Sequence, residues 1–269
     1  MFRFVRAYPP ARPAEGPVLL LQFHNGEFVH RREAFSPVVP GPEGMVPRLF
    51  VGMLDGVPCL AEALPESEAL PEGMRTVGLR SLYGHIDEAY YVLVGYAAQL
   101  VRWQRTARFC SVCASEMRDV TNTWGRECPN CGHTGYPPVS PAVLALVHDG
   151  GDRVLLAQKP GWGDRFSILA GFVEPGESLE ECVVREVHEE VGVLVDDPTY
   201  QGSQSWPFPH QIMIGFTCRY RSGEVVPDET ELSRAEWFRY DAMPELPPPL
   251  SLSRQIIDRW VASRRNSGN

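Results

Sequence analysis

The sequence predicts an α+β protein made of three successive parts, and three observations support this prediction. Short β-type runs separated by Pro- and Gly-rich turns dominate residues 1–105, which end in a helical pattern. Two Cys-x2-Cys pairs follow within residues 106–136. Residues 137–269 combine further β-type runs with two amphipathic helical patterns. We therefore expect an N-terminal β-rich domain, a zinc ribbon and a larger C-terminal α+β domain.

Composition narrows the class of protein. The chain has 269 residues, of which 43% are hydrophobic and 22% charged, as in ordinary globular proteins. Its net charge of −9 gives no broad basis for general nucleic-acid binding, although a nucleic-acid end could still be a substrate. The first ten residues hold no long apolar segment, and the apolar run 89–101 is too short to span a bilayer. We expect a cytoplasmic protein without a membrane anchor.

The N-terminal part is expected to be an antiparallel β domain that ends in one helix. Residues 18–23 and 48–54 have the composition of strands, and residues 39–44 form a Pro- and Gly-rich turn. Asp87 is suited to cap a helix that runs to about Thr106, because apolar side chains then recur every three or four residues. No catalytic pattern is visible here.

Four cysteines form the pattern C-x2-C-x14-C-x2-C, namely Cys110, Cys113, Cys128 and Cys131. This spacing is typical of a zinc ribbon with four thiolate ligands. Because four thiolates saturate Zn²⁺, we expect a structural ion; a redox or iron–sulfur site is the alternative. The odd total of seven cysteines also favours metal binding over disulfides and indicates a reducing compartment.

The C-terminal part alternates strands and helices. A helix should follow Ser178, continue to Val191 and end at Gly192. Strands are expected at residues 142–147, 153–158, 200–205, 211–220 and 235–239, with a final packing helix at Leu252–Ala262.

Acidic side chains concentrate on the first of these helices. Glu186 and Glu190 are four residues apart and share a face, with Glu189 beside them and Glu177 on the preceding loop. Like charges at this spacing repel each other unless cations neutralise them. Carboxylate oxygens suit Mg²⁺ or Mn²⁺, so we expect a divalent-cation site; a solvated acidic face is the alternative.

The stretch from Gly171 to Val193 fills every fixed position of the pattern G-x5-E-x7-R-E-U-x-E-E-x-G-U, where U is apolar. It resembles the Nudix box. The resemblance implies an α/β/α sandwich with a mixed sheet that hydrolyses diphosphates. It implies that Glu186, Glu190 and the carbonyl of Ala170 bind the catalytic metal. By resemblance, Glu189 is a metal ligand or a base that orients water, and Glu177 supports the metal site. Arg185 forms an ion pair that ties the loop to the helix. Glu231, or alternatively Glu229, adds a ligand from a later loop.

Residues 203–211, Ser-Gln-Ser-Trp-Pro-Phe-Pro-His-Gln, resemble the S-Q-P-W-P-F-P-x-S signature of NADH pyrophosphatases, the NudC-type subfamily of Nudix hydrolases. Ser205 and Gln211 depart from it, which puts substrate preference in question. The resemblance implies hydrolysis of NAD(H) to NMN(H) and AMP, removal of NAD caps from RNA 5′ ends, and a homodimer. The substrate-binding residues it implies are Phe172, Tyr136, Gln204, Trp206 and Phe208. The alternatives are a broader nucleoside-diphosphate hydrolase, or a zinc-ribbon nucleic-acid-binding protein with a vestigial Nudix domain.

Overall fold

The computed structural model describes residues 3–8, 17–31 and 49–267. The chain divides into two compact units, Met1–Pro138 and Val139–Asn269. The turn expected at residues 39–44 lies outside the described residues. Within the part of the chain that is described, no helix combines the length and the apolar character needed to cross a membrane.

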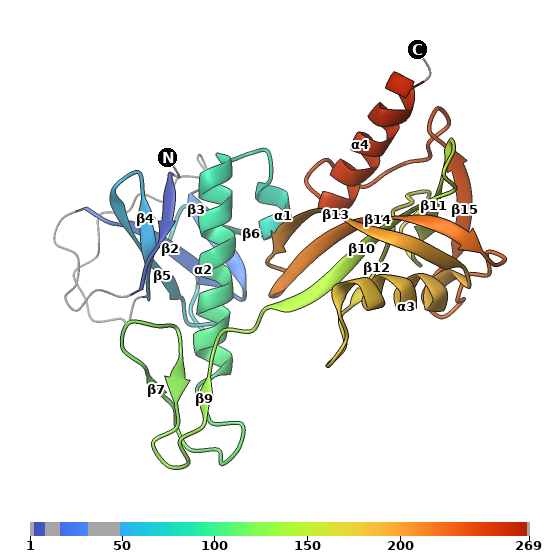
Figure 1. The fold of residues 1–269 in the computed structure, drawn as a ribbon. Coiled ribbons are helices and arrows are strands. Elements are labelled where there is room, and N and C mark those ends of the chain that lie inside the picture. The colour runs from blue at the N-terminus through green and yellow to red at the C-terminus, as the bar shows by residue number, and fades with distance from the viewer. Residues whose placement is uncertain (1–2, 9–16, 32–48, 268–269) are drawn as a thin grey trace. The chain divides into compact units, whose positions relative to one another are not determined.

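The first unit contains a six-stranded sheet in the order β1-β4-β5-β2-β3-β6 (Figure 1). Its strands are β1 (Phe4–Arg6), β2 (Leu19–His24), β3 (Glu27–Arg31), β4 (Leu49–Leu54), β5 (Val57–Ala63) and β6 (Met74–Val77). Two hairpins build most of it, because Asn25-Gly26 and Asp55-Gly56 adopt the positive φ angles that two-residue turns require. The prediction of a wholly antiparallel domain was wrong at one place. The hairpins lie side by side with β2 parallel to β5, a pairing that no local turn encodes.

A long helix, α2 (Glu88–Thr106), follows a short one, α1 (Leu79–Leu82). The Asp87 carboxylate accepts hydrogen bonds from the backbone N–H groups of Ala89 and Tyr90, which confirms the predicted cap. Leu93, Val94 and Ala97 are completely buried, as expected for the face that packs on the sheet.

The zinc ribbon is a three-stranded antiparallel sheet made of β7 (Arg118–Asp119), β8 (Arg126–Glu127) and β9 (Thr134–Gly135). Side chains from the middle and the C-terminal end of α2 hold it. The Trp103 indole N–H donates to the carbonyl of Trp124 (2.9 Å), and the Trp124 indole N–H donates to the Tyr96 hydroxyl (2.8 Å). The ribbon therefore belongs to the first compact unit.

The second unit contains a mixed sheet in the order β13-β14-β10-β11-β15, with β12 paired to β10. Its strands are β10 (Ser140–His148), β11 (Arg153–Gln158), β12 (Leu169–Phe172), β13 (Leu194–Trp206), β14 (Gln211–Ser222) and β15 (Arg234–Arg239). β10 and β14 are parallel and the other pairs antiparallel. β13 begins six residues earlier than predicted, because bulges around Asp197 (φ 54°) keep it paired to β14.

Helices cover both faces of this sheet (Figure 1). Along β10, Val143, Ala145 and Val147 join the core under α3 (Leu179–Val191), whereas Leu144 and Leu146 join the core under α4 (Leu252–Ser267). This alternation is the two-residue period of a strand buried on both faces. The predicted α/β/α sandwich is confirmed.

Candidate active site and zinc centre

The position of α3 is set by strong signals at both ends. Ser178 and Glu181 form a capping box, in which each side chain accepts a hydrogen bond from the other residue's backbone N–H. Gly192 ends the helix in the left-handed conformation at φ 74°, as predicted. Val183, Val187 and Val191 are fully buried against the sheet, and the acidic face beside them meets β12 at Gly171 and Ala170.

Glu190 is the most deeply buried of the acidic side chains on α3, with 3% of its surface exposed. Its Oε2 accepts a hydrogen bond from the backbone N–H of Ala170 (3.3 Å), on β12. Its Oε1 accepts no hydrogen bond from the described residues and lies 3.4 Å from Nζ of Lys159. Burial raises the pKa of Glu190 to about 7, although the Lys159 charge opposes this shift.

Glu186 occupies space that only a glycine leaves open. A Cβ atom at Gly171 would lie 1.7 Å from Cδ of Glu186 and 2.0 Å from both carboxylate oxygens. The box glycine therefore lets the carboxylate lie directly against β12. Burial raises the pKa of Glu186, hydrogen bonding to Arg185 opposes the shift, and the charges of Glu189 and Glu231 add to it.

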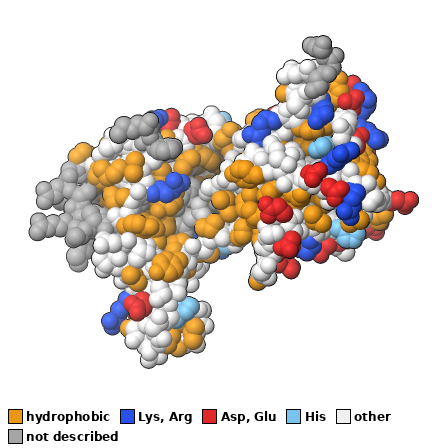
Figure 2. All heavy atoms as spheres, in the orientation of Figure 1, with side chains coloured by type: hydrophobic (Ala, Val, Ile, Leu, Met, Phe, Trp, Pro, Cys, Tyr) orange, Lys and Arg blue, Asp and Glu red, His pale blue; other side chains and the backbone are white. Residues whose placement is uncertain are grey.

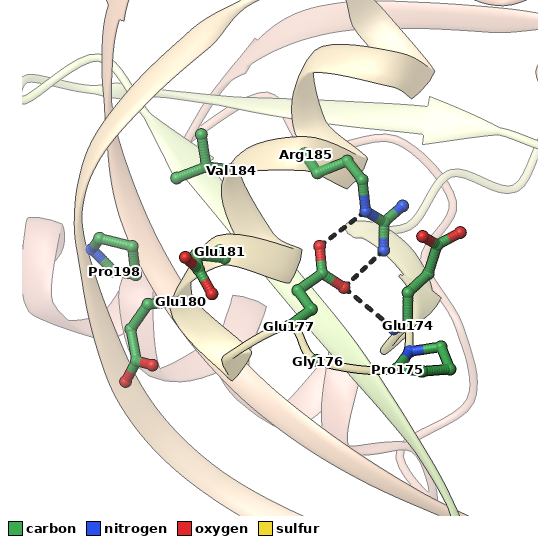
Figure 3. Close-up of a pocket in the computed structure, with 9 residues that line it drawn as sticks. All are labelled: Glu174, Pro175, Gly176, Glu177, Glu180, Glu181, Val184, Arg185 and Pro198. Atoms are coloured by element: carbon green, nitrogen blue, oxygen red, sulfur yellow. Dashed lines mark hydrogen bonds and ion pairs between the residues drawn. The ribbon is translucent and has the colours of Figure 1, made fainter.

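Arg185 links the loop before α3 to the acidic face of the helix. Its guanidinium donates to both oxygens of Glu177 (2.7 and 2.9 Å), as Figure 3 shows, and also to the Phe172 carbonyl (2.9 Å). It reaches Glu186 (3.0 Å) and Glu189 (2.8 Å) as well. The hydrogen bonds from Arg185 and from the Glu174 N–H lower the pKa of Glu177 to about 2.

The acidic loop that follows β14 is held at the C-terminal end of α3. Val226 N–H donates to the Val191 carbonyl (3.0 Å), and Asp228 N–H donates to the Glu190 carbonyl (2.9 Å). These bonds hold the loop that carries exposed Glu231, whose charge helps to raise the pKa of Glu186. Glu189 has 58% of its side chain exposed and is held by Arg185.

The structure thus gathers two of the predicted metal-binding carboxylates, Glu186 and Glu190, beside Ala170. It leaves Glu189 and Glu231 at the margin. In the described part of the chain, the cysteines form the single group of three or more metal-binding side chains whose ligand atoms lie within 4.8 Å. The carboxylate pair nevertheless fits a hard divalent cation, because one buried oxygen of Glu190 lacks a hydrogen bond. The side chains of Lys159 and Arg185 already bring positive charge to the pair.

Lys159 is a site residue that the sequence analysis missed. It directly follows β11 and reaches Glu190, which lies 31 residues further along the chain. The composition of the chain could have drawn attention to this residue. Of the 25 lysine and arginine residues of the chain, Lys159 is the only lysine.

An open hollow of about 690 Å³ lies beside the loop and the first turns of α3 (Figure 3). The Glu177–Arg185 pair forms part of its wall, whereas Glu186 and Glu190 do not line it. Its lining residues are Glu174, Pro175, Gly176, Glu177, Glu180, Glu181, Val184, Arg185 and Pro198. The hollow therefore shares Arg185 with the carboxylate pair, because Arg185 lines the hollow and also contacts Glu186.

Gln204 is engaged in holding the start of α4. Its Nε2 donates to the Leu250 carbonyl (2.8 Å) and its Oε1 accepts from the Leu252 N–H (2.8 Å). The side-chain amide therefore joins the end of β13 to the start of α4, and the substrate contact expected by resemblance stays a prediction. Trp206 and Phe208 lie edge to face, with ring centroids 5.0 Å apart.

Two predicted base-binding aromatics are exposed within their own units. Phe172, at the end of β12, is 53% exposed. Tyr136 is 60% exposed and packs one side of its ring on Gly125, where a Cβ atom would lie 2.8 Å from the ring. Each ring therefore keeps surface available for stacking.

The four cysteines form a compact thiolate site. Sulfur–sulfur distances are 3.6 Å for Cys110 and Cys131, 3.4 Å for Cys113 and Cys128, and 3.5 Å for Cys113 and Cys131. Tetrahedral ligation at a Zn–S distance of about 2.3 Å requires sulfur atoms roughly 3.8 Å apart. The four sulfur atoms fit a zinc ion with a complete set of thiolate ligands, and a set of four leaves no position for a substrate.

Comparison with known proteins agrees with this arrangement. Family models match residues 17–103 (NADH pyrophosphatase-like rudimentary NUDIX domain), 105–136 (NADH pyrophosphatase zinc ribbon domain) and 138–261 (NUDIX domain). The chain is 46% identical to NAD-capped RNA hydrolase NudC of Pseudomonas aeruginosa, over 80% of this chain and 77% of the relative. It is 43% identical to NAD-capped RNA hydrolase NudC of Deinococcus radiodurans, over 77% of this chain and 75% of that relative. A crystal structure of a NUDIX hydrolase from Nitrosomonas europaea has the same fold, with a TM-score of 0.50 and 22% identity over 59% of this chain and 93% of that one.

Proposed function

Because this chain belongs to the Nudix hydrolase family, in the branch of the NADH pyrophosphatases and NAD-capped RNA hydrolases, we propose that it hydrolyses the diphosphate of NAD(H) to NMN(H) and AMP. We also propose that it removes NAD caps from RNA 5′ ends. The observation that carries the proposal is the pair of half-buried Glu186 and buried Glu190 against β12, since a metal-dependent diphosphate hydrolase uses carboxylates to hold its cation.

The carboxylates of Glu186 and Glu190, with the carbonyl of Ala170, would hold Mg²⁺ or Mn²⁺. The ion supplies positive charge for the diphosphate oxygens. Glu231 adds a carboxylate from the loop held by Val191 and Glu190. Glu189, exposed at the margin of the pair, is placed to orient a water or accept its proton. Arg185 keeps the loop and helix in register through Glu177.

We propose that the flat bases of the substrate stack on Phe172 and Tyr136, and that Trp206 and Phe208 shape the same pocket. Exposed rings offer such stacking surfaces at low entropic cost. A homodimer would bring Tyr136 of one chain to Phe172 of its partner. Gln204 supports this pocket, because it fixes the end of β13, which leads to Trp206 and Phe208, to the start of α4.

RNA would be recognised mainly through its NAD cap. On the face shown in Figure 2, basic and acidic side chains are interspersed over the C-terminal unit, in keeping with the net charge of −9. Such a surface offers little general attraction for an RNA backbone. We propose a cytoplasmic location, where both NAD(H) and RNA occur and where the seven cysteines, all free in the structure, stay reduced.

The test is hydrolysis of NADH with Mn²⁺, with phosphate released from the products by a phosphatase. We expect turnover by the natural protein and by Glu180→Gln, an exposed carboxylate on the same helix. Glu190→Gln should lose at least about a hundred-fold in kcat while its circular dichroism stays unchanged. Near-native turnover in Glu190→Gln would contradict the assignment.

Substrate choice is measured by parallel kinetics on NADH, NAD⁺ and NAD-capped RNA. Turnover of other diphosphates without NAD(H) would instead support a broader nucleoside-diphosphate hydrolase. RNA binding with no turnover of any diphosphate would support a vestigial Nudix domain.

A further inference from the structure

We propose that Lys159 is an exchangeable counter-cation of Glu190, which occupies the cation position in the metal-free enzyme, leaves it when the divalent ion binds, and thereby sets the metal affinity. The proposal rests on the proposed function only in that Glu190 is taken as a metal ligand. It assigns a positioning role to a residue outside the box.

The contact geometry identifies Lys159 as the partner of one particular oxygen. Nζ lies 3.4 Å from Oε1 of Glu190, while Oε2 is held by the Ala170 N–H. Among the described residues, Oε1 accepts no hydrogen bond. A carboxylate with 3% exposure is costly to ionise without a nearby positive charge. Lys159 supplies that charge at the oxygen that a metal ion would also need.

The backbone that carries Lys159 is fixed, whereas its side chain has room to move. Gln158 is buried, its side-chain amide donates to the Gly163 carbonyl, and its carbonyl accepts from the Ser233 N–H (2.8 Å). The Trp162 N–H donates to the Lys159 carbonyl (3.2 Å) and closes the loop. The Lys159 side chain is 37% exposed. A side chain that starts from a fixed point and ends near solvent can exchange one partner for another without refolding.

The presence of a lysine rather than an arginine at position 159 also supports an exchangeable contact. Lys159 is the only lysine among 25 basic residues, and Arg185 holds the neighbouring carboxylates. A guanidinium forms forked contacts that fix its partners, as Arg185 does with Glu177. An ammonium is a compact, well-hydrated charge on a flexible stem. Arginine thus suits the permanent link and lysine the exchangeable one.

Binding of a divalent ion changes the balance of charge at Glu190. An ammonium and a divalent ion cannot share the same oxygen at contact distance, because like charges repel strongly where water is excluded. Lys159 therefore has to withdraw toward solvent, and the work of displacing it lowers the metal affinity. Removing the ammonium should raise that affinity once Glu190 is ionised.

The single lysine permits a direct test of the exchange. Protein labelled with ¹³C and ¹⁵N at lysine shows one lysine side-chain NMR signal, which is followed during titration with Mg²⁺. We expect a saturable shift toward the position of a solvated lysine. Glu190→Gln should place the signal there before any Mg²⁺ is added. A signal that does not respond to saturating Mg²⁺ would overturn the proposal.

The affinity is measured with Mn²⁺ alone by electron paramagnetic resonance, at about pH 8.5 so that carboxylates are ionised. Lys159→Gln should bind Mn²⁺ roughly ten-fold more tightly, which corresponds to about 1.4 kcal/mol. Lys159→Arg, which keeps the charge, should not bind more tightly than the natural protein. Arg165→Gln removes a charge from the same loop and should leave the affinity unchanged; the guanidinium of Arg165 lies over Trp162.

Other outcomes separate this proposal from the proposed function. Unchanged or weaker Mn²⁺ binding by Lys159→Gln would overturn the counter-cation role, and a raised KM for NADH alongside it would make Lys159 a substrate ligand. Tighter Mn²⁺ binding in Lys159→Gln, in a protein that hydrolyses no NAD(H), would support the role of Lys159 and refute the proposed substrate.

Discussion

Replacing Gly171 by alanine tests whether the glycine exists to seat Glu186. The added Cβ would lie 1.7 Å from Cδ of Glu186, whereas ordinary contact begins at 3.4 Å. The carboxyl group must therefore retreat by roughly 1.7 Å, and a misplacement of about 1 Å can already cost a hundred-fold in rate. We expect kcat/KM for NADH with Mn²⁺ to fall by about 10²–10³-fold.

Stability should change little in this variant. The obstructing group is the end of a flexible side chain, and the φ angle at Gly171 is not positive, so alanine fits the backbone. We expect the Tm of Gly171→Ala to stay within a few degrees of the natural protein. Gly78→Ala is the matched control, since the nearest atom to its Cβ would be an oxygen of Glu27 at 3.9 Å.

A double-mutant cycle decides whether the effect passes through Glu186. If Gly171→Ala acts by displacing that carboxylate, it should add almost nothing in a Glu186→Gln background. Independent, multiplicative losses in the double variant would refute the reasoning. So would a Gly171→Ala enzyme that keeps more than about a third of the natural kcat/KM, since a displaced ligand cannot leave the rate nearly intact.

Three further predictions concern stability. Burial raises the folded-state pKa of Glu190 to about 7, so metal-free protein should lose stability as pH rises from about 4.5 through 7. Glu190→Gln should remove this loss. In melts with EDTA above pH 7, its free energy of unfolding should exceed that of the natural protein by up to about 3 kcal/mol. Gln204→Ala should lower the free energy of unfolding in urea by about 1–3 kcal/mol, because the Leu250 carbonyl and Leu252 N–H lose their partners. Gln204→Glu should not restore it, since a carboxylate cannot donate to Leu250, and full recovery would contradict the clamp. A zinc-selective chelator, with Mg²⁺ in excess, should increase proteolysis within residues 106–136 and lower the Tm, because thiolates such as buried Cys128 lose their ion; an unchanged Tm would argue against a structural zinc site.

The elements that the sequence predicted well are those specified by nearby residues. The cap at Asp87, the start of α3 at Ser178 and its end at Gly192 depend on contacts within one helical turn. The pairing of strands that lie far apart in the sequence was harder to predict. Neither the parallel pairing of β2 with β5 nor the full length of β13 has a local signature. Bulges keep β13 in register through residues that resemble a turn.

The candidate site shows the same division. The carboxylates of α3 could be assigned from their spacing, because four residues bring two side chains to one helix face. The reason for a glycine at position 171 could not be predicted, because it is the carboxylate of Glu186, which lies against it from another element. The resemblance assigns Gln204 to substrate binding, and the structure adds that its side chain clamps the start of α4. Its two partners lie more than forty residues away along the chain.

By itself, the sequence determined the thiolate set for zinc, the acidic helix face, and the α+β class with its Nudix-like C-terminal part. These properties follow from residue type and short-range spacing, which the chain carries before it folds. Only the tertiary structure decided that Glu190 is buried, that Glu186 lies on Gly171, and that Lys159 meets Glu190. Burial and ion pairing depend on which surfaces of distant segments come together, and the packing of α3 on the sheet creates those contacts.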